Sequence, residues 1–205
     1  MPINNIISFD DARLLVWEVT ERIDELKSML KELAESELDQ IVSEKRKLEF
    51  LGIRVALHEL LDEEVRVCYT DEHKPYLINN KYEISVSHSG KWIAVIIHPT
   101  RYVGIDIEIP TPKIQRVYTR FLSEREQTEL SNGQDLMQLQ IAWSAKEALY
   151  KIIGKEAVDF ANQLRIFPFE AKQEGEISAE HIPTKKTYQL QYIQHSDYTL
   201  AYCLA

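Results

Sequence analysis

The sequence is poor in the residues that mark several classes of protein. It has two cysteines among 205 residues, Cys68 and Cys203, and no Cys/His cluster with the spacing of a zinc site. Both cysteines lie in apolar, strand-like runs, so a reduced, cytoplasmic protein is the simplest interpretation, although a bridge between them stays open. No apolar run approaches the length of a membrane span, and the N-terminal residues lack the pattern of a signal peptide. We therefore expect no membrane association.

Basic residues are also scarce relative to acidic ones. The chain has 24 Lys and Arg against 33 Asp and Glu, which gives a formal net charge of −9. This balance argues against general nucleic-acid binding, because that binding depends on Lys and Arg neutralising phosphates. An acidic ligand would need local basic patches, and the sequence offers two: Lys45-Arg46-Lys47 with Arg54, and Lys113, Arg116, Arg120 and Arg125.

The apolar pattern predicts the same order of elements twice, a strand, then helices, then three strands. In the first half these are a strand over 13–19, helices over 23–34 and 39–61, and strands over 65–69, 82–88 and 92–98. In the second half they are a strand over 102–109, helical segments over 114–130 and 135–153, and strands over 163–169, 187–194 and 198–204. The segment 172–186 is predicted to be a polar loop or hairpin connection, and Ser89-Gly90 a tight turn.

The final hairpins of the two halves align without gaps, so that His88-Ser89 meets His195-Ser196 and Ala94 meets Ala201. We infer an internal duplication. The expected fold is α+β, with two similar α/β halves covering residues 1–100 and 101–205.

Two motifs carry the chemistry. Gly104-Ile-Asp106-Ile-Glu108 lies in a predicted strand, where period-two alternation points both carboxylates to one face. Trp143-Ser-Ala-Lys146-Glu147-Ala-Leu-Tyr-Lys151 lies in a predicted helix, where Glu147 and Lys151 share a face. Oxygen ligands in small number suit Mg²⁺, which substrate phosphates often complete, so phosphoryl-type transfer is indicated. Taken singly, each motif also has an ordinary explanation, as a solvated helix pair or an exposed strand end.

Together the two motifs resemble those of the 4′-phosphopantetheinyl transferases of the larger, surfactin-synthetase-activating type. The resemblance extends to Lys74-Pro75 and to the strand Ile84-Ser-Val-Ser87-His88-Ser89. It implies two halves related by pseudo-two-fold symmetry, with the active site in the cleft between them, and a monomer that holds one complete site. It also implies transfer of the 4′-phosphopantetheine arm of coenzyme A to a serine of an apo acyl or peptidyl carrier protein, with release of 3′,5′-ADP. The carrier would serve fatty-acid, polyketide or non-ribosomal peptide biosynthesis.

The resemblance also implies roles for single residues. Asp106, Glu108 and Glu147 would bind Mg²⁺; Glu147 could take the serine proton, and Lys151 could neutralise the departing phosphate. Trp143 would be a packing residue that orients the carboxylate. The expected coenzyme A contacts are Arg46, Arg54, Lys74, Pro75, Ser87, His88, Lys151 and, as a secondary phosphate contact, Lys146. His73 replaces the glycine usual before Lys74-Pro75, which puts the local turn in doubt, because histidine reaches positive φ less readily than glycine.

The carrier protein would dock on segment 113–125, whose basic residues could meet an acidic helix while Val117, Phe121 and Leu122 make an apolar contact. An amphipathic helix with its apolar side in the core explains the same pattern equally well. Two other functions stay open: a catalytically weak relative that only binds coenzyme A or the carrier, and a Mg²⁺-dependent nucleotide phosphohydrolase.

Overall fold

A computed structural model describes residues 6–30, 35–63, 66–71, 73–130, 133–154 and 158–205. The chain divides into two compact units, Met1–Thr100 and Arg101–Ala205. Each unit has a hydrophobic core of its own between a sheet and its helices. The mixed α/β class agrees with the prediction, whereas the pseudo-two-fold symmetry and the cleft stay predictions.

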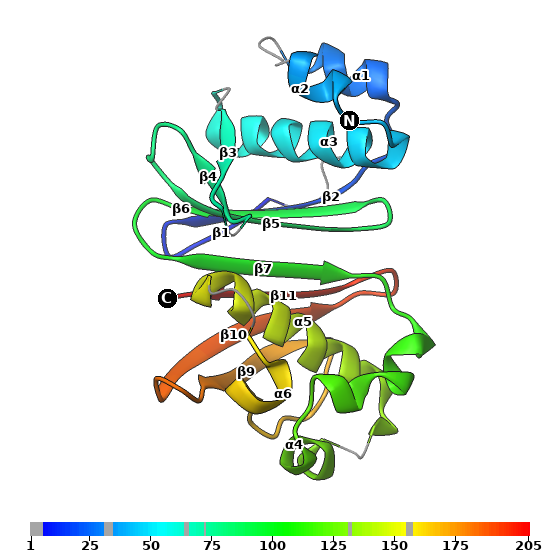
Figure 1. Ribbon diagram of the computed structural model, residues 1–205, viewed down its shortest axis with the longest axis vertical. Coiled ribbons are helices and arrows are strands. Elements are labelled where there is room, and N and C mark those ends of the chain that lie inside the picture. The colour runs from blue at the N-terminus through cyan, green and yellow to red at the C-terminus, as the bar shows by residue number, and fades with distance from the viewer. Residues whose placement is uncertain (1–5, 31–34, 64–65, 72, 131–132, 155–157) are drawn as a thin grey trace. The chain divides into compact units, whose positions relative to one another are not determined.

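The first unit is built on a four-stranded antiparallel sheet (Figure 1). Its order is β1 (Ile6–Phe9), β2 (Ala12–Glu18), β6 (Trp92–His98) and β5 (Glu83–Ser89). The turn between β5 and β6 consists of Gly90 and Lys91, one residue later than predicted, and Gly90 has a φ of 59°. A positive φ at the first turn residue favours glycine there. The sequence prediction did not include β1.

Three helices lie beyond one face of this sheet: α1 (Ile23–Ser28), α2 (Glu35–Asp39) and α3 (Glu44–Leu61). The predicted helix over 39–61 begins late, because Ser43 caps α3 by accepting a hydrogen bond from the Arg46 amide. The predicted helix over 23–34 ends at Ser28, and residues 31–34 lie outside the described residues. Leu51, Val55 and other buried residues of α3 pack on β2 and β6.

A two-stranded ribbon completes the first unit, with β3 (Val67–Tyr69) paired to β4 (Pro75–Leu77). The start of the predicted strand over 65–69 lies outside the described residues, and β4 was not predicted. The turn between the strands forms despite His73, which adopts a φ of 61°. His73 donates its amide to the Thr70 carbonyl at 2.9 Å, and Thr70 donates its own amide to the Lys74 carbonyl at 3.0 Å.

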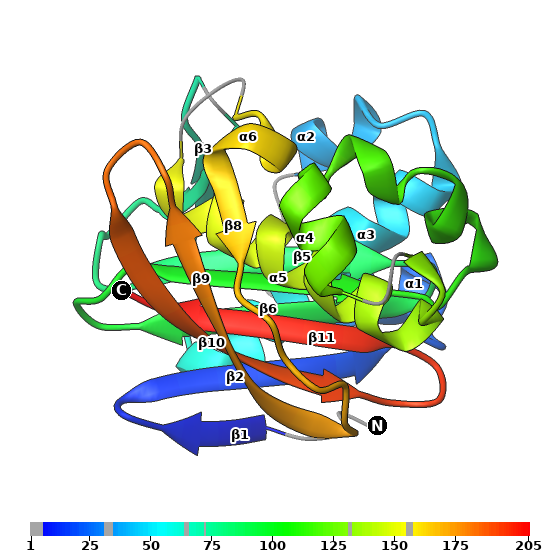
Figure 2. The same cartoon turned by 90° about the horizontal axis from the view of Figure 1, so that it is seen from below.

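The second unit is built on a five-stranded antiparallel sheet (Figure 2). Its order is β7 (Val103–Glu108), β11 (Thr199–Leu204), β10 (Lys186–Gln194), β9 (Glu174–His181) and β8 (Leu164–Ile166). Of the two alternatives predicted for 172–186, the polar loop is wrong, because residues 174–181 form β9, whereas the hairpin agrees with the antiparallel pairing of β10 with β9. In β9 the side chains alternate between the two faces of the sheet. Its inward positions, Ile177, Ala179 and His181, are buried and alternate with polar residues, so one face of the strand is apolar enough to join the core.

The long helix α5 (Leu136–Ile153) packs across this sheet. As predicted, it ends at Gly154, whose φ of 62° is left-handed, and Asp135 caps its start. Shorter helices precede and follow it: η1 (Pro112–Arg116), η2 (Tyr118–Arg120), α4 (Glu124–Glu129) and α6 (Phe160–Gln163). The strand predicted over 163–169 is shorter at both ends, because α6 includes residue 163 and the strand stops at Ile166. Among the described residues, no helix is long and apolar enough to cross a membrane.

The two sheets share part of their strand order, since β2, β6 and β5 follow one another as β7, β11 and β10 do. The gapless alignment of the two hairpins is nevertheless wrong in detail. Ser89 pairs with Trp92 across a two-residue turn, whereas Gln194 pairs with Thr199 across the four residues 195–198. By strand pairing, His88 therefore corresponds to Ile193 and not to His195.

Candidate active site

The site in the second unit begins with a close approach between β7 and α5. A Cβ atom on Gly104 would collide with the Ala148 carbonyl oxygen and would lie 2.8 Å from Cγ1 of Ile152. Only a glycine hydrogen fits in that space, so the helix can lie against the strand at this point. Gly104, Asp106 and Glu108 alternate with buried isoleucines on β7 and therefore share the face that meets α5.

Two contacts join the strand carboxylates to the helix. Lys151 places its Nζ 3.1 Å from Oδ1 of Asp106 and donates to the Ile105 carbonyl at 2.7 Å. Trp143, two turns earlier on the same helix face, donates its indole N–H to Oε1 of Glu108 at 3.4 Å. The predicted packing role of Trp143 therefore concerns Glu108, a residue of the neighbouring strand.

Glu147 lies between these two helix residues and within range of both strand carboxylates. Burial, the negative charge of Asp106 and, more weakly, that of Glu108 raise the pKa of Glu147 from its ordinary 4.5 to about 7, against the opposing effect of Lys151. A glutamate with this pKa can exchange a proton near neutral pH. The structure thus brings the four predicted residues Asp106, Glu108, Glu147 and Lys151 into one cluster.

The donors of this cluster fit a hard divalent cation in kind, since all are carboxylate oxygens. Burial is the main cause of the raised pKa of Glu147, and the charges of Asp106 and Glu108 add to it; a bound cation would relieve this second, repulsive contribution. In their present orientations, however, no three His, Cys, Asp or Glu side chains in the described part of the chain converge to hold a metal ion. The ammonium group of Lys151 forms an ion pair with Asp106. Binding would therefore require these side chains to reorient.

Lys146 does not belong to this cluster, and its prediction as a phosphate contact is wrong for this structure. Its side chain is 0% exposed and forms an ion pair with Glu126, whose side chain is also 0% exposed, at 2.7 Å. Burial lowers the pKa of Lys146 to about 8, while Glu126 acts in the opposite direction. A ligand cannot reach this ammonium group without displacing the surrounding chain.

A pocket of about 700 Å³ in the first unit brings together two of the residues predicted to contact coenzyme A, Arg46 and His88. The prediction did not include Ser43, Glu49 or Tyr69, which also line it. His88 places Nδ1 3.3 Å from Oε1 of Glu49. Of these three residues, Ser43 could have been found from the sequence. Serine is a common N-cap residue, and the free backbone amides at the start of a helix favour anions.

The other predicted coenzyme A contacts lie elsewhere in the first unit. Arg54, only 12% exposed, pairs with Glu37 at 3.3 Å, and its guanidinium lies over the ring of Phe50 on α3. Those contacts make Arg54 a packing residue here and exclude it from the pocket lining. Lys74 lies 3.6 Å from Glu83, Pro75 begins β4, and Ser87 is buried in β5.

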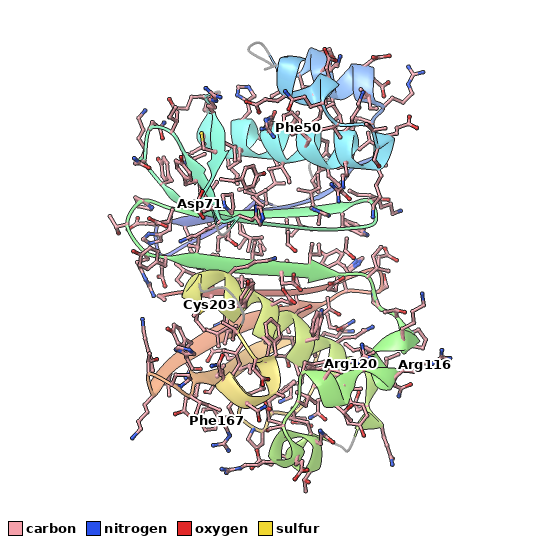
Figure 3. The ribbon with its side chains drawn as sticks, viewed as in Figure 1. Phe50, Asp71, Arg116, Arg120, Phe167 and Cys203 are labelled. Carbon is pink, nitrogen blue, oxygen red and sulfur yellow. The ribbon has the colours of Figure 1, made fainter. Side chains whose placement is uncertain are left out.

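The segment 113–125 combines exposed basic residues with an apolar hollow. Arg116 and Arg120 are exposed on this segment (Figure 3), as is Lys113, while Arg125 pairs with Glu129 at 2.8 Å. The prediction that Phe121 and Leu122 form an apolar contact surface is wrong, because they are 2% and 0% exposed and belong to the core. Val117 instead lines a pocket of about 210 Å³ next to Glu108. Its other lining residues are Ile109, Thr111, Lys113, Ile114, Gln140 and Trp143.

The geometry thus places three carboxylates and one lysine between a strand and a helix. Comparison with known proteins is more specific. Residues 102–203 match the family model of the 4′-phosphopantetheinyl transferase superfamily, and through this domain the chain belongs to that superfamily.

Two curated proteins are similar to the chain. One, from Haemophilus influenzae, bears the name "Putative 4′-phosphopantetheinyl transferase" and is 29% identical over 109 residues, covering 50% of this chain and 46% of the relative. The other, from Synechocystis sp., has the same description and is 26% identical over 148 residues, covering 65% of this chain and 59% of the relative. The chain thus spans about half the length of these relatives.

Proposed function

We propose that this protein transfers the 4′-phosphopantetheine arm of coenzyme A to a serine of an apo acyl or peptidyl carrier protein. The observation that carries the proposal is the cluster of Asp106, Glu108, Glu147 and Lys151, assembled by the close packing of α5 on β7. It lies within the segment that matches the superfamily. The protein would act as a cytoplasmic monomer, in fatty-acid, polyketide or non-ribosomal peptide biosynthesis.

In the proposed reaction the serine oxygen forms a bond to the phosphorus that carries the pantetheine arm, and the bond from that phosphorus to the 3′,5′-ADP oxygen breaks. Glu147 accepts the serine proton, directly or through water, because its pKa of about 7 allows it to be ionised at neutral pH. Lys151, beside Asp106, is placed to neutralise the charge that develops on the departing phosphate.

Asp106, Glu108 and Glu147 are the residues that would hold Mg²⁺. When bound, the ion would supply Lewis-acid stabilisation of the pyrophosphate charge. Their chemistry supports this assignment, as does the raised pKa of Glu147.

The pocket of the first unit is proposed to bind the 3′-phosphate end of coenzyme A. Arg46 offers a planar, permanently charged guanidinium, and His88 an imidazole, to an anion at this pocket. Glu49, which also lines the pocket, contacts His88. The carrier protein is proposed to dock on segment 113–125, next to the apolar pocket beside Glu108.

The test is the intact mass of a panel of apo carrier proteins after incubation with this protein, coenzyme A and Mg²⁺. A phosphopantetheine adduct that is lost with EDTA, with Asp106→Ala and with Glu147→Gln would establish the transfer and the metal requirement together. Full activity of either folded variant would refute the assignment of the carboxylates. Binding of coenzyme A without an adduct on any carrier would favour the binding-only relative, and release of phosphate from nucleotides without a protein acceptor would favour the phosphohydrolase.

A further inference from the structure

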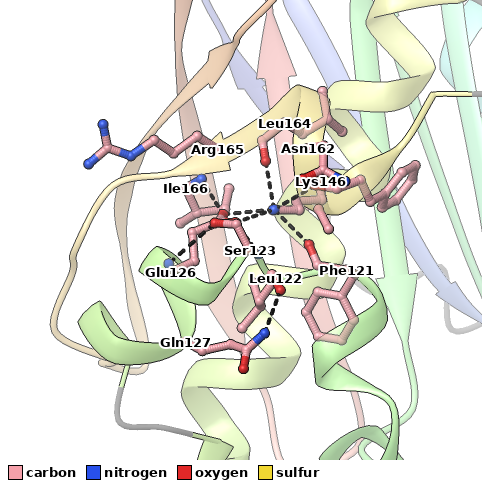
Figure 4. Close-up of polar contacts among 12 residues, drawn as sticks. Phe121, Leu122, Ser123, Glu126, Gln127, Lys146, Asn162, Leu164, Arg165 and Ile166 are labelled. Carbon is pink, nitrogen blue, oxygen red and sulfur yellow. Dashed lines mark hydrogen bonds and ion pairs between the residues drawn. The ribbon is translucent and has the colours of Figure 1, made fainter.

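A completely buried ion pair lies at the centre of a network of polar contacts (Figure 4). Lys146, one residue before Glu147 on α5, pairs with Glu126 of α4, and both side chains are completely buried. Glu126 accepts further hydrogen bonds from the Ser123 amide and hydroxyl, each at 2.8 Å, and from the Ile166 amide at 2.8 Å. The pair therefore connects α5, α4 and β8.

The ammonium group of Lys146 also holds separate segments by their main chain. It donates to the carbonyl oxygens of Phe121 at 2.7 Å, Phe160 at 2.8 Å and Leu164 at 2.7 Å. With Glu126, these acceptors satisfy all three protons of the ammonium group. The backbones of Phe121 and Phe160, which are distant in sequence, are thereby fixed at one point.

The rings of these two phenylalanines flank Trp143. The ring of Phe121 meets the indole edge-on with centroids 5.1 Å apart, and the ring of Phe160 lies 5.7 Å from it on a tilted plane. Trp143 in turn donates its indole N–H to Glu108. A continuous set of contacts thus runs from Lys146 through the two phenylalanines and Trp143 to one of the carboxylates of the site.

We infer that Lys146 is a positioning residue: through its pair with Glu126 it fixes Phe121 and Phe160 around Trp143, and so sets the place of Glu108 opposite Glu147. The inference rests on the proposed function for its consequence in catalysis, but its structural part can be measured without it.

A role in stability alone is the competing explanation, and the chemistry of buried pairs argues against it. Replacing a buried ion pair by uncharged residues of similar volume is often neutral for stability, so such a pair is weak evidence for a purely stabilising role. What uncharged residues cannot reproduce here is the simultaneous direction of three carbonyl groups and one carboxylate. A misplacement of about 1 Å at reacting groups can reduce a rate roughly a hundredfold.

The test compares the double variant Lys146→Met/Glu126→Gln with the wild type. The change leaves no buried charge, and the new side-chain amide at position 126 can still accept from Ile166 and donate to a freed carbonyl. A matched control is Lys172→Met/Glu170→Gln, which removes an exposed ion pair of 3.2 Å in the same unit. Unfolding temperature, kcat and KM for coenzyme A are measured together with the indole N–H resonance of Trp143, assigned with Trp143→Phe.

In the folded double variant we expect kcat to fall by roughly ten- to a hundredfold with KM for coenzyme A changed by less than about threefold, and the Trp143 resonance to move. The resonances of Trp17 and Trp92, which belong to the first unit, should stay in place, and the control should match the wild type in every measurement. An unchanged Trp143 resonance with kcat within about twofold of wild type would overturn the inference.

If the wild-type protein transfers nothing, the proposed function fails, and the Trp143 resonance alone decides the positioning: movement supports it and constancy refutes it. If the double variant does not fold, Phe160→Leu tests the same contacts without changing a buried charge. Phe160→Leu should lower kcat and move the Trp143 resonance. Phe160→Tyr keeps the ring, so its kcat and its Trp143 resonance should match those of the wild type. If Phe160→Leu leaves either kcat or the Trp143 resonance unchanged, the inference is refuted.

Discussion

Replacing Glu147 by glutamine should stabilise the protein at alkaline pH while it abolishes transfer. The side chain is buried beside Asp106 and Glu108, and its pKa is raised from 4.5 to about 7. Ionised Glu147 is therefore less favourable in the folded than in the unfolded chain. The Glu147→Gln substitution keeps the shape of the side chain and removes the charge, so the variant escapes this cost.

The size of the effect follows from the pKa. Since each pKa unit corresponds to about 1.4 kcal/mol, a pKa of about 7 in place of 4.5 corresponds to about 3 kcal/mol. The sign follows from linkage. Well below pH 4.5, Glu147 is protonated in both the folded and the unfolded chain, so its titration does not change the free energy of unfolding. As the pH rises from 4.5 through 7, the unfolded chain loses this proton more readily than the folded chain, and the free energy of unfolding of the wild type falls. The difference in free energy of unfolding between variant and wild type should therefore grow by about 3 kcal/mol between about pH 4 and pH 8.

Urea unfolding of both proteins at several pH values, in EDTA, measures this difference. Glu170→Gln is the control, because that carboxylate is exposed and its replacement should leave the pH dependence unchanged. Added Mg²⁺ should reduce the difference in free energy of unfolding between the variant and the wild type at pH 8, because a bound cation would favour ionised Glu147. A difference that does not change with pH, or that becomes smaller as the pH rises, would refute the raised pKa of Glu147 on which this prediction rests.

Three further predictions concern other parts of the structure. Gly104→Ala should lower the free energy of unfolding by about 1–3 kcal/mol and reduce activity, because the new methyl group would push α5 away from β7; an unfolding temperature equal to wild type would contradict this. Arg46→Ala should raise KM for coenzyme A more than KM for dephospho-coenzyme A, and an equal rise for both substrates would exclude a contact between Arg46 and the 3′-phosphate. Arg54→Ala should mainly lower the unfolding temperature. Iodoacetamide at pH 8 should modify Cys68 and spare Cys203, since burial raises the pKa of Cys203 to about 12; peptide mass mapping of the folded protein checks it, and rapid labelling of Cys203 would show that the strand opens.

The sequence was sufficient for the elements with a strong, regular pattern. The strand Trp92–His98 and the helix that ends at Gly154 were predicted closely, because a continuous apolar run and a glycine stop are local signals. The alternation along β7 and the helical spacing of Glu147 and Lys151 also predicted which of these side chains share a face, and in the structure Lys151 contacts Asp106. Both cysteines are free, so the bridge that the sequence left open is not formed in this structure.

Other features depend on contacts that no local pattern encodes. The apolar residues of β9 lie on one face only, and the charged and polar residues of the other face gave the segment the composition of a loop. The motif alone assigned Lys146 to a phosphate, whereas its direction depends on Glu126 and on three carbonyl groups supplied by distant segments. Arg54 likewise pairs with Glu37, which lies on α2, a helix that was not predicted from the sequence.

The turn at His73 has a consequence for how this protein can change. A left-handed φ costs a non-glycine residue roughly 1 kcal/mol, and the chain accepts that cost because two main-chain hydrogen bonds hold the turn. Replacing His73 by glycine would remove this cost from the folded chain, while the greater conformational entropy of glycine in the unfolded chain would offset part of the gain in stability. Glycine at position 73 would therefore offset part of the cost of a destabilising substitution elsewhere, for example one that improves recognition of a new carrier.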